Sequence, residues 1–508
     1  MTFGFLNALI KFLTAVALLI KSGLAQSDAS FPLKISVDLA RLFPIKHDYE
    51  NGEVMYDRLV LTIIPAVVKH IEETFESYDV EKIQVNDTPC EKLNITSYAN
   101  TELKSNFHIV FNFEDTDTGY TAYAGVCKVD EANKRPVMAF VYINVRNNVL
   151  DDKSFNEQVF TTLLHELHHG LGFLSSYIPY FWDRGVKKYR PQSEVFSSSQ
   201  SYRVRIKRPE LVSWVSNHFN CPYPQVNGYG APLENLGGDE SQDSHFEASI
   251  FGNEALNPSA FYNLQYTGAT IAYIESMGYF KVQEPKTKMA EILFWGYKKG
   301  CGVLQDNLRC EDIPMVCQKS GTQCSEDYYS VGQCSLDHVN PSNQNKAINS
   351  CSVFKERLDC RYQSKLGSRC VEFLQEGVSR NATCGDIECT RRAGNQELYD
   401  VVMKFKEFSV ACTAEEVGTF KTPSGSQDKV TCPNTLNICR LGAKCPNDCT
   451  NNGRCKMDGK CWCFPDFTGD DCSKINPTPY RMMVLDWSAK TLSLMPVVYF
   501  LISYAALR

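Results

Sequence analysis

The placement of the cysteines most constrains how this chain can fold. Nineteen of the 22 cysteines lie from Cys301 onward, and only Cys90, Cys127 and Cys221 precede them. The C-terminal part is therefore expected to fold around disulfide bonds, and the part before it around an apolar core. This cysteine usage also indicates an oxidised, exported protein. The length of 508 residues predicts about three structural units.

Composition excludes two broad classes of protein. Hydrophobic residues make up 43% of the chain and charged residues 22%, which is too apolar for a largely disordered protein. The 52 basic and 59 acidic side chains give a formal net charge of −7. Nucleic acid is therefore not expected as a partner.

The N-terminus has the features of a secretory signal. Residues 12–20 form an uncharged apolar stretch, and the small residues Gly23 and Ala25 follow it. We expect residues 1–25 to be removed as a signal peptide, because the apolar stretch is too short to span a membrane. Three Asn-x-Ser/Thr sequons fit the same route, at Asn86, Asn94 and Asn381.

A second apolar segment, residues 492–507, closes the chain and is followed only by Arg508. Such a segment predicts either a short membrane span or the removable tail of a glycolipid-anchor signal. The protein is then expected on the extracellular face of the cell membrane. A buried C-terminal helix of a secreted protein is the alternative.

The first half reads as an α+β fold. Alternation over residues 33–39 predicts a strand with one buried face, and apolar residues at three-to-four spacing over 57–77 predict an amphipathic helix bent at Pro65. Residues 108–113, 120–129 and 140–145 are rich in β-formers. A mixed sheet backed by a helix is expected.

The motif that carries chemistry is HExxH, at His165, Glu166 and His169. On a helix the two histidines lie one turn apart, so both can reach one Zn²⁺ at about 2.0–2.1 Å. Glu166 lies about 100° round the helix, beside the water on the metal, where a general base is needed. His168 is offset from this face, and we expect it at a cleft edge or on the surface. The opposite arc is apolar: Val159, Phe160, Leu163, Leu164 and Leu167.

Two protein ligands are one fewer than a catalytic zinc usually has. Gly172 can end the helix with a left-handed turn that redirects the chain. No histidine follows within a few residues, so the third ligand must come from beyond a large insertion or be a distant carboxylate.

These motifs resemble the leishmanolysin family, metzincin-type cell-surface zinc proteases with a long insertion before the third histidine. The resemblance covers residues 33 to about 441 and is carried by four segments, 165–173, 235–245, 266–280 and 291–301. It implies His245 as the third ligand in preference to His218. It also implies a methionine turn at 254–257, where this chain has Leu256, which raises a question about activity.

The last cysteine-rich segment, 445–472, has six cysteines in 28 positions. It resembles an EGF-like module, which implies disulfides joining residues 445 to 455, 449 to 461 and 463 to 472. A zinc knuckle is a weaker alternative in an exported chain. The module is expected to act as a spacer or as a contact for other proteins.

Together these features predict a zinc endopeptidase that cleaves proteins or peptides, with Glu166 activating the zinc-bound water. The substrate is expected to lie along an edge strand at 119–129. The sequence assigns no residue to stabilise the oxyanion, because Tyr262 and Tyr266 have only their proximity to the Leu256 turn in their favour. The alternative is a weak or inactive protease scaffold that serves as a surface adhesion protein.

The predicted organisation has six parts. They are a signal peptide (1–25), a catalytic subdomain (26–178), an inserted subdomain with the third histidine (179–280), a Cys-rich domain (281–441), the EGF-like module (442–473) and a linker with the anchor signal (474–508).

Overall fold

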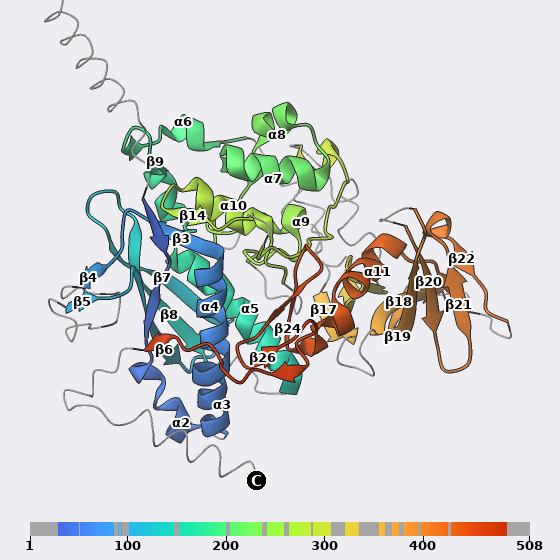
Figure 1. Cartoon of the computed structure of the whole chain (residues 1–508). Helices are drawn as coiled ribbons and strands as arrows, with labels where there is room; N and C mark the ends of the chain where they lie inside the picture. The colour runs from blue at the N-terminus through green and yellow to red at the C-terminus, as the bar shows by residue number, and fades with distance from the viewer. Residues whose placement is uncertain are drawn as a thin grey trace, which may run out of the picture.

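The computed structural model places an α+β part, which contains the HExxH segment, beside a disulfide-rich β lobe (Figure 1). This confirms the predicted fold class. The structure describes residues 29–49, 51–85, 90, 93, 101–146, 152–199, 204–235, 241–258, 264–285, 288–305, 321–334, 355–360, 368–374, 380–394, 398–424 and 428–484.

The α+β part is built on a five-stranded mixed sheet. Its strands, in spatial order, are β28 (Met483–Val484), β2 (Ile35–Asp38), β6 (Phe107–Glu114), β8 (Pro136–Asn144) and β7 (Ala122–Val129). All neighbours are parallel except β7, which runs antiparallel to β8 at the edge. The prediction of an edge strand in this region is therefore confirmed.

The first strand differs from its prediction in one respect. All four residues of β2 are buried, not only one face. The polar Ser36 can be buried because its hydroxyl is hydrogen-bonded to Ser105 Oγ at 2.6 Å and to His108 Nδ1 at 2.9 Å. An alternating sequence pattern shows which side chains are polar, but a polar side chain whose hydrogen bonds are made within the protein can still be buried.

The predicted long helix is interrupted. It consists of α3 (Gly52–Arg58), a π-helical turn η2 (Leu59–Ile63) and α4 (Ile64–Thr74). Pro65 lies in the first turn of α4, where its missing N–H leaves no hydrogen bond unmade. The chain then leaves the helix three residues earlier than predicted and forms β3 (Phe75–Tyr78) between β1 (Ser30–Pro32) and β14 (Phe280–Val282).

The HExxH segment lies on α5 (Asp152–Gly170), which packs against α4, β7 and β8 (Figure 1). Its predicted apolar arc is buried throughout. The helix ends at Gly170, and Gly172 takes a φ of 109° in the turn that follows. Only glycine adopts such a conformation without strain.

The insertion after α5 is largely helical. It contains η4 (Ser175–Tyr180), α6 (Gln192–Val195), α7 (Pro209–Phe219), α8 (Tyr223–Tyr229), α9 (Ala248–Phe251) and α10 (Gly268–Ser276). Short strands β9 (Trp182–Asp183), β10 (Lys188–Tyr189), β11 (Phe196–Ser197), β12 (Arg205–Ile206) and β13 (Ala231–Pro232) connect them. The disulfide Cys221–Cys301 ties the end of α7 to the chain that leaves the insertion.

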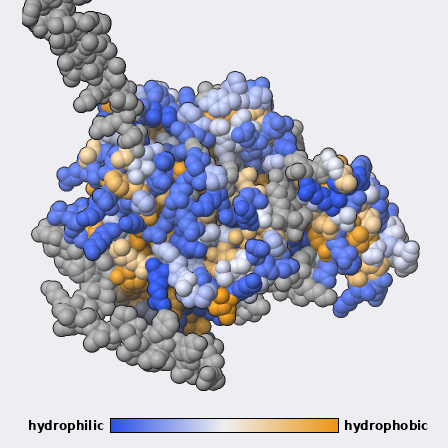
Figure 2. Space-filling view, viewed as in Figure 1, coloured by the Kyte–Doolittle hydropathy of each residue, from blue (hydrophilic) through white to orange (hydrophobic). Residues whose placement is uncertain are grey.

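The β lobe contains two antiparallel sheets. One is β15 (Gly321–Cys324), β16 (Ser330–Cys334) and β17 (Lys355–Asp359). The other, in spatial order, is β21 (Ser409–Cys412), β20 (Tyr399–Lys404), β19 (Arg380–Arg391), β18 (Ser368–Leu374), β23 (Lys429–Thr431) and β22 (Phe420–Lys421). Its disulfides include 324–370, 360–384, 389–439 and 412–432. Figure 2 shows apolar patches on this lobe within a mainly hydrophilic face.

The chain returns through α11 (Thr435–Lys444) and η10 (Pro446–Asn451) to a small module beside α5 (Figure 1). The module has strands β24 (Gly453–Cys455), β25 (Cys461–Cys463), β26 (Phe467–Thr468) and β27 (Lys474–Ile475). Its disulfides join residues 445 to 455, 449 to 461 and 463 to 472. The pairing implied by the EGF-like resemblance is therefore confirmed, and these cysteines are not metal ligands.

Several predicted features lie outside the described residues: the signal peptide, the apolar segment 492–507, and the sequons at Asn86 and Asn94. Asn381 lies on β19, opposite Phe373 of β18. Within the ranges that the structure describes, no helix has the length and apolar character needed to cross a membrane.

Candidate metal centre

Three histidines converge at one point between α5 and the segment that precedes α9. The Nε2 atom of His169 lies 2.9 Å from Nε2 of His165 and 3.2 Å from Nε2 of His245. The third distance, between Nε2 of His165 and Nε2 of His245, is 3.2 Å. The two histidines predicted from the helix and the one implied by the family resemblance are thus brought together.

The hydrogen bonds of the other ring nitrogens fix the state of these rings. Nδ1 lies 2.6 Å from the Ala255 carbonyl in His165, 2.7 Å from the Phe173 carbonyl in His169 and 3.0 Å from the Ser241 carbonyl in His245. A carbonyl oxygen can only accept, so each Nδ1 must carry the hydrogen. In a neutral ring this leaves a bare lone pair on each Nε2.

Burial favours these neutral rings. It lowers the pKa of His165 to about 4 and that of His245 to about 3, and it lowers the pKa of His169 well below the usual range. Three lone pairs therefore face one another at hydrogen-bonding distance without a hydrogen between them.

This donor set fits a tetrahedral metal ion. With metal–nitrogen distances of about 2.0–2.1 Å, tetrahedral ligand nitrogens lie about 3.3 Å apart, close to the separations seen here. A cation at the centre would also relieve the repulsion between the lone pairs. The three carbonyl contacts are the kind of second-shell hydrogen bond that orients metal-binding histidines.

Glu166 lies on α5 next to His165 and is 6% exposed. Burial raises the pKa of its carboxyl group to about 8. The carboxylate form is therefore costly unless a positive charge lies nearby. A buried carboxyl group with a raised pKa, one residue along the helix from His165, is typical of a functional site.

The segment after His245 supports the centre through its backbone. Leu256, at the position implied for the methionine turn, is fully buried, and its carbonyl accepts a hydrogen bond from Phe246 N. Ala255 supplies the carbonyl that binds His165. Glu254 shapes this turn by accepting hydrogen bonds from Leu256 N at 2.6 Å and from Thr270 Oγ1 at 2.7 Å. A backbone acceptor such as Ala255 leaves no signal in a sequence.

One prediction about a histidine was wrong. His168 is fully buried, where the sequence predicted a cleft edge or the surface. Its Nδ1 donates to the Leu164 carbonyl at 2.7 Å, so its Nε2 accepts from Tyr266 Oη at 2.9 Å. The helix has a second buried side there, because Tyr266 and Phe75 pack on it.

The competing histidine, His218, is not part of the cluster. It is buried on α7, where its ring stacks on Trp214 and its Nε2 lies 2.8 Å from the Trp295 carbonyl. Tyr266 is also buried, and its hydroxyl group is hydrogen-bonded to His168. Tyr262 lies outside the described residues.

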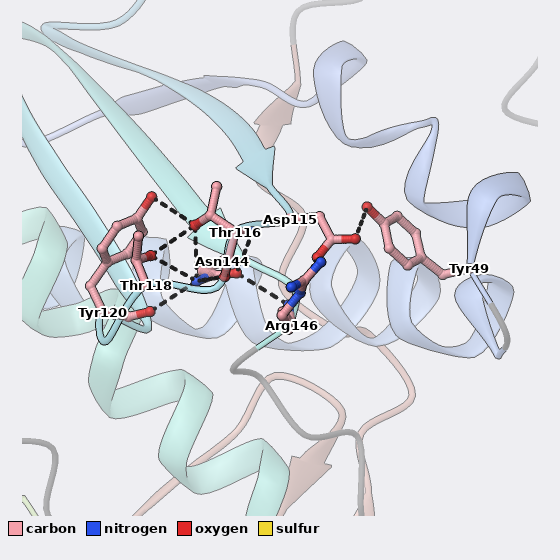
Figure 3. A network of polar contacts seen from close by, with 7 residues as sticks. All are labelled: Tyr49, Asp115, Thr116, Thr118, Tyr120, Asn144 and Arg146. Atoms are coloured by element: carbon pink, nitrogen blue, oxygen red, sulfur yellow. Dashed lines mark hydrogen bonds and ion pairs between the residues drawn. The ribbon is translucent and has the colours of Figure 1, made fainter.

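A polar network holds the loop that leads into the edge strand β7 (Figure 3). Asn144, fully buried at the end of β8, donates to the carbonyls of Thr116 at 3.0 Å and Tyr120 at 3.1 Å. It also accepts from Arg146 N, and Arg146 Nε donates to Asp115 at 2.7 Å. The network fixes where β7 begins.

The fold and the three-histidine cluster define the class as a metallopeptidase-type fold, and comparison with known proteins gives the family. The sequence profile described as Leishmanolysin, peptidase M8, matches residues 53–348, which is 296 of 508 residues. The chain belongs to the leishmanolysin family. A second profile, described as a Teneurin-like EGF domain, matches residues 445–474.

Individual relatives are more distant. The chain is 28% identical over 233 residues to the ciliated left-right organizer metallopeptidase of Xenopus laevis, covering 42% of this chain and 30% of that protein. It is 25% identical over 261 residues to the leishmanolysin-like peptidase of Drosophila melanogaster, covering 42% of this chain and 37% of that protein. The matches thus span about a third of the length of these relatives.

Proposed function

We propose that the protein is a zinc-dependent endopeptidase, with His165, His169 and His245 as metal ligands and Glu166 as general base. One observation carries this proposal: three Nε2 lone pairs converge at one point, and two of them belong to α5, the helix that also carries the buried Glu166. Membership of the leishmanolysin family supports it.

The residues of this chain divide the work of amide hydrolysis. A bound Zn²⁺ would polarise the scissile carbonyl and lower the pKa of a coordinated water towards about 7. Glu166 takes the proton from the attacking water and delivers it to the leaving amine. The carbonyls of Ala255, Phe173 and Ser241 keep the three ligand rings in the tautomer that binds metal.

The edge strand β7 suits an extended substrate. Among the described strands it pairs only with β8, and it packs against α5. Backbone groups on an open strand edge can pair with a peptide and hold its scissile bond in register. Proteins or peptides are therefore the proposed substrates.

The disulfides and the EGF-like module indicate the secretory pathway. We further propose the six-part organisation predicted from the sequence, with attachment to the outer face of the cell membrane through residues 492–507. A purely adhesive scaffold would need neither a general base nor a complete set of ligands, so the site favours catalysis.

The test is cleavage of a mixed peptide library by the purified full-length protein and its Glu166→Ala variant. Both are expected to bind zinc, and only the wild type is expected to cleave. Glu194→Ala, which removes a carboxylate that is 56% exposed, is the matched control and should cleave like the wild type. Equal cleavage by Glu166→Ala, or none by a zinc-loaded wild type, would overturn the proposal.

A further inference from the structure

We propose that Arg454, in the EGF-like module, is a positioning residue for the metal centre, so that the module is part of the metal-binding unit. The inference rests on the proposed function, because it assumes that the three histidines hold a metal. A continuous set of contacts joins the Arg454 side chain to the hydrogen bond that orients His165.

The Arg454 side chain is only 5% exposed and lies between three acceptors outside the module. Its guanidinium group donates to both carboxylate oxygens of Glu291, at 2.5 and 2.6 Å, and also to Glu157 on α5. It donates in addition to the Leu264 carbonyl at 2.7 Å. One side chain thus bridges the active-site helix to two segments of chain that follow the Leu256 turn.

The bond to Leu264 leads directly to a metal ligand. The next residue, Gln265, forms a parallel bridge with Glu254, and its carbonyl accepts from Ala255 N at 2.8 Å. The Ala255 carbonyl accepts from His165 Nδ1 at 2.6 Å. Arg454 therefore holds the strand-like segment that places the acceptor for His165.

A second route runs through Glu291. Besides binding Arg454, Glu291 accepts from Tyr266 N at 3.0 Å, and its own N–H donates to the Tyr266 carbonyl at 2.7 Å. Tyr266 in turn donates to His168 on α5 at 2.9 Å. Arg454 thus holds the backbone next to the Leu256 turn. Through Glu291 it also holds Tyr266, whose side chain is hydrogen-bonded to α5.

Aromatic packing fixes the module in the same place. Trp462, only 5% exposed, packs against His70 at 4.9 Å and Phe160 at 5.8 Å between ring centroids. Its indole N–H donates to Glu73 at 2.8 Å. Phe160 belongs to the apolar arc of α5, so the module covers the side of the helix that faces away from the metal.

This arrangement assigns the module an intramolecular role. The face of the module with Arg454 and Trp462 is buried against the α+β part that contains α5, so it is not available to another protein. A buried arginine between two carboxylates is stable only with this geometry, because removing one partner leaves a charge unpaired. The module therefore fixes the position of α5 relative to the Leu256 turn.

The test measures zinc affinity rather than activity. Full-length wild type, Arg454→Met, Glu157→Gln and Lys460→Met are titrated with zinc against a chromophoric chelator. Lys460 is an exposed cation of the same module and serves as the matched control. Thermal unfolding is followed in parallel, and affinity is compared at a temperature at which every variant is folded.

We expect Arg454→Met to weaken zinc binding on the order of tenfold, the range seen when outer-shell partners of metal ligands are lost. Glu157→Gln, which keeps the shape of the side chain, should weaken it severalfold, and Lys460→Met should not change it. The d–d spectrum of the Co²⁺-substituted protein should shift in Arg454→Met, because His165 is no longer held in place.

Folded Arg454→Met with the zinc affinity and Co²⁺ spectrum of the wild type would overturn the inference, even if it unfolds at a lower temperature. If Arg454→Met does not fold, wild-type affinity in Glu157→Gln has the same meaning. A wild type that binds no zinc would overturn the proposed function together with this inference. Zinc binding and cleavage by the wild type with unchanged variants would overturn the inference alone.

Discussion

At the scale of single residues, the metal centre depends on hydrogen bonds that a sequence does not display. The HExxH spacing predicted two metal ligands and a general base, and the family resemblance implied His245 as the third ligand. What suits these rings to the proposed role of metal ligands is the set of three backbone carbonyls, which forces each Nε2 to present a lone pair. Those acceptors belong to residues of ordinary type, such as Ala255.

The assignment of the third ligand can be tested by comparing two buried histidines. His245→Ala should weaken zinc binding by more than about a hundredfold, because a ligand itself is lost and outer-shell changes alone cost up to about that factor. His218→Gln should bind zinc like the wild type, although it loses the stacking on Trp214 and some stability. Equilibrium dialysis with zinc checks both. Zinc loss in His218→Gln rather than in His245→Ala would contradict the assignment.

Leu256, where the family has methionine, is expected to be a neutral replacement. Its side chain is fully buried, but the contact with His165 comes from the carbonyl of Ala255. Leu256→Met conserves volume and should change the free energy of unfolding by less than about 1.5 kcal/mol. Peptide cleavage should also stay within about twofold of the wild type, a change of about 0.4 kcal/mol in the activation barrier, because the carbonyl that orients His165 belongs to Ala255 and is unchanged. A large gain in cleavage by Leu256→Met would show that leucine impairs the enzyme.

At the scale of elements, local sequence patterns predicted helices and strands correctly where no tertiary contact altered the local structure. The apolar arc of α5 identified that helix, and the β-rich runs identified β6, β7 and β8. His168 was misplaced because periodicity gives the direction of a side chain but not what packs there, in this case Tyr266. The π-helical turn before Pro65 also has no clear sequence signature.

The final strand β28 gives a prediction at this scale. It pairs with β2, and Tyr480 just before it donates to Glu72 at 2.6 Å. A chain ending at Pro477, which keeps β27, should therefore unfold with about 2 kcal/mol less free energy than one ending at Val484, from the lost hydrogen bond and buried apolar area. Denaturant unfolding of the two chains measures the difference. Equal stability would mean that the final strand contributes nothing to the sheet.

At the scale of the whole molecule, residues far apart in sequence form one unit. Arg454 contacts residue 157 on α5 and residue 291 beyond the insertion, and the EGF-like module lies against α5 as a result (Figure 1). The resemblance to an EGF-like module implied its disulfide pairing, but the module was expected to act as a spacer or as a contact for other proteins. Pairings across roughly 160 and 300 residues depend on the complete fold, so no local pattern could predict them.

Buried ionisable groups predict how the stability of the metal-free protein depends on pH. The pKa values of seven histidines, all of them buried except the half-buried His165, are lowered, so protonation in the unfolded state destabilises the fold as pH falls below about 6.5. Buried Glu166 and Glu254 have pKa values raised to about 8 and 7, and burial also raises the pKa of Glu247, so stability falls as pH rises from about 4.5 towards 8. The histidines are His70, His108, His165, His168, His169, His218 and His245.

Because the histidines outnumber the carboxyl groups, their effect dominates below about pH 6.5, and the carboxyl groups dominate above it. Thermal unfolding of the metal-free protein should therefore show maximal stability near pH 6.5, with a steeper fall on the acid side. A melting temperature that rises steadily as the pH falls from 6.5 to 4.5 would contradict this account of the buried charges.

The most direct test of the central claim is a zinc titration of peptide cleavage by full-length protein that has first been stripped with a chelator. Cleavage should be absent in the stripped protein, rise in proportion to added zinc and reach a plateau at one ion per chain. Cleavage that persists without metal, or a folded chain that takes up no zinc, would contradict the claim that His165, His169 and His245 form the metal centre of a peptidase.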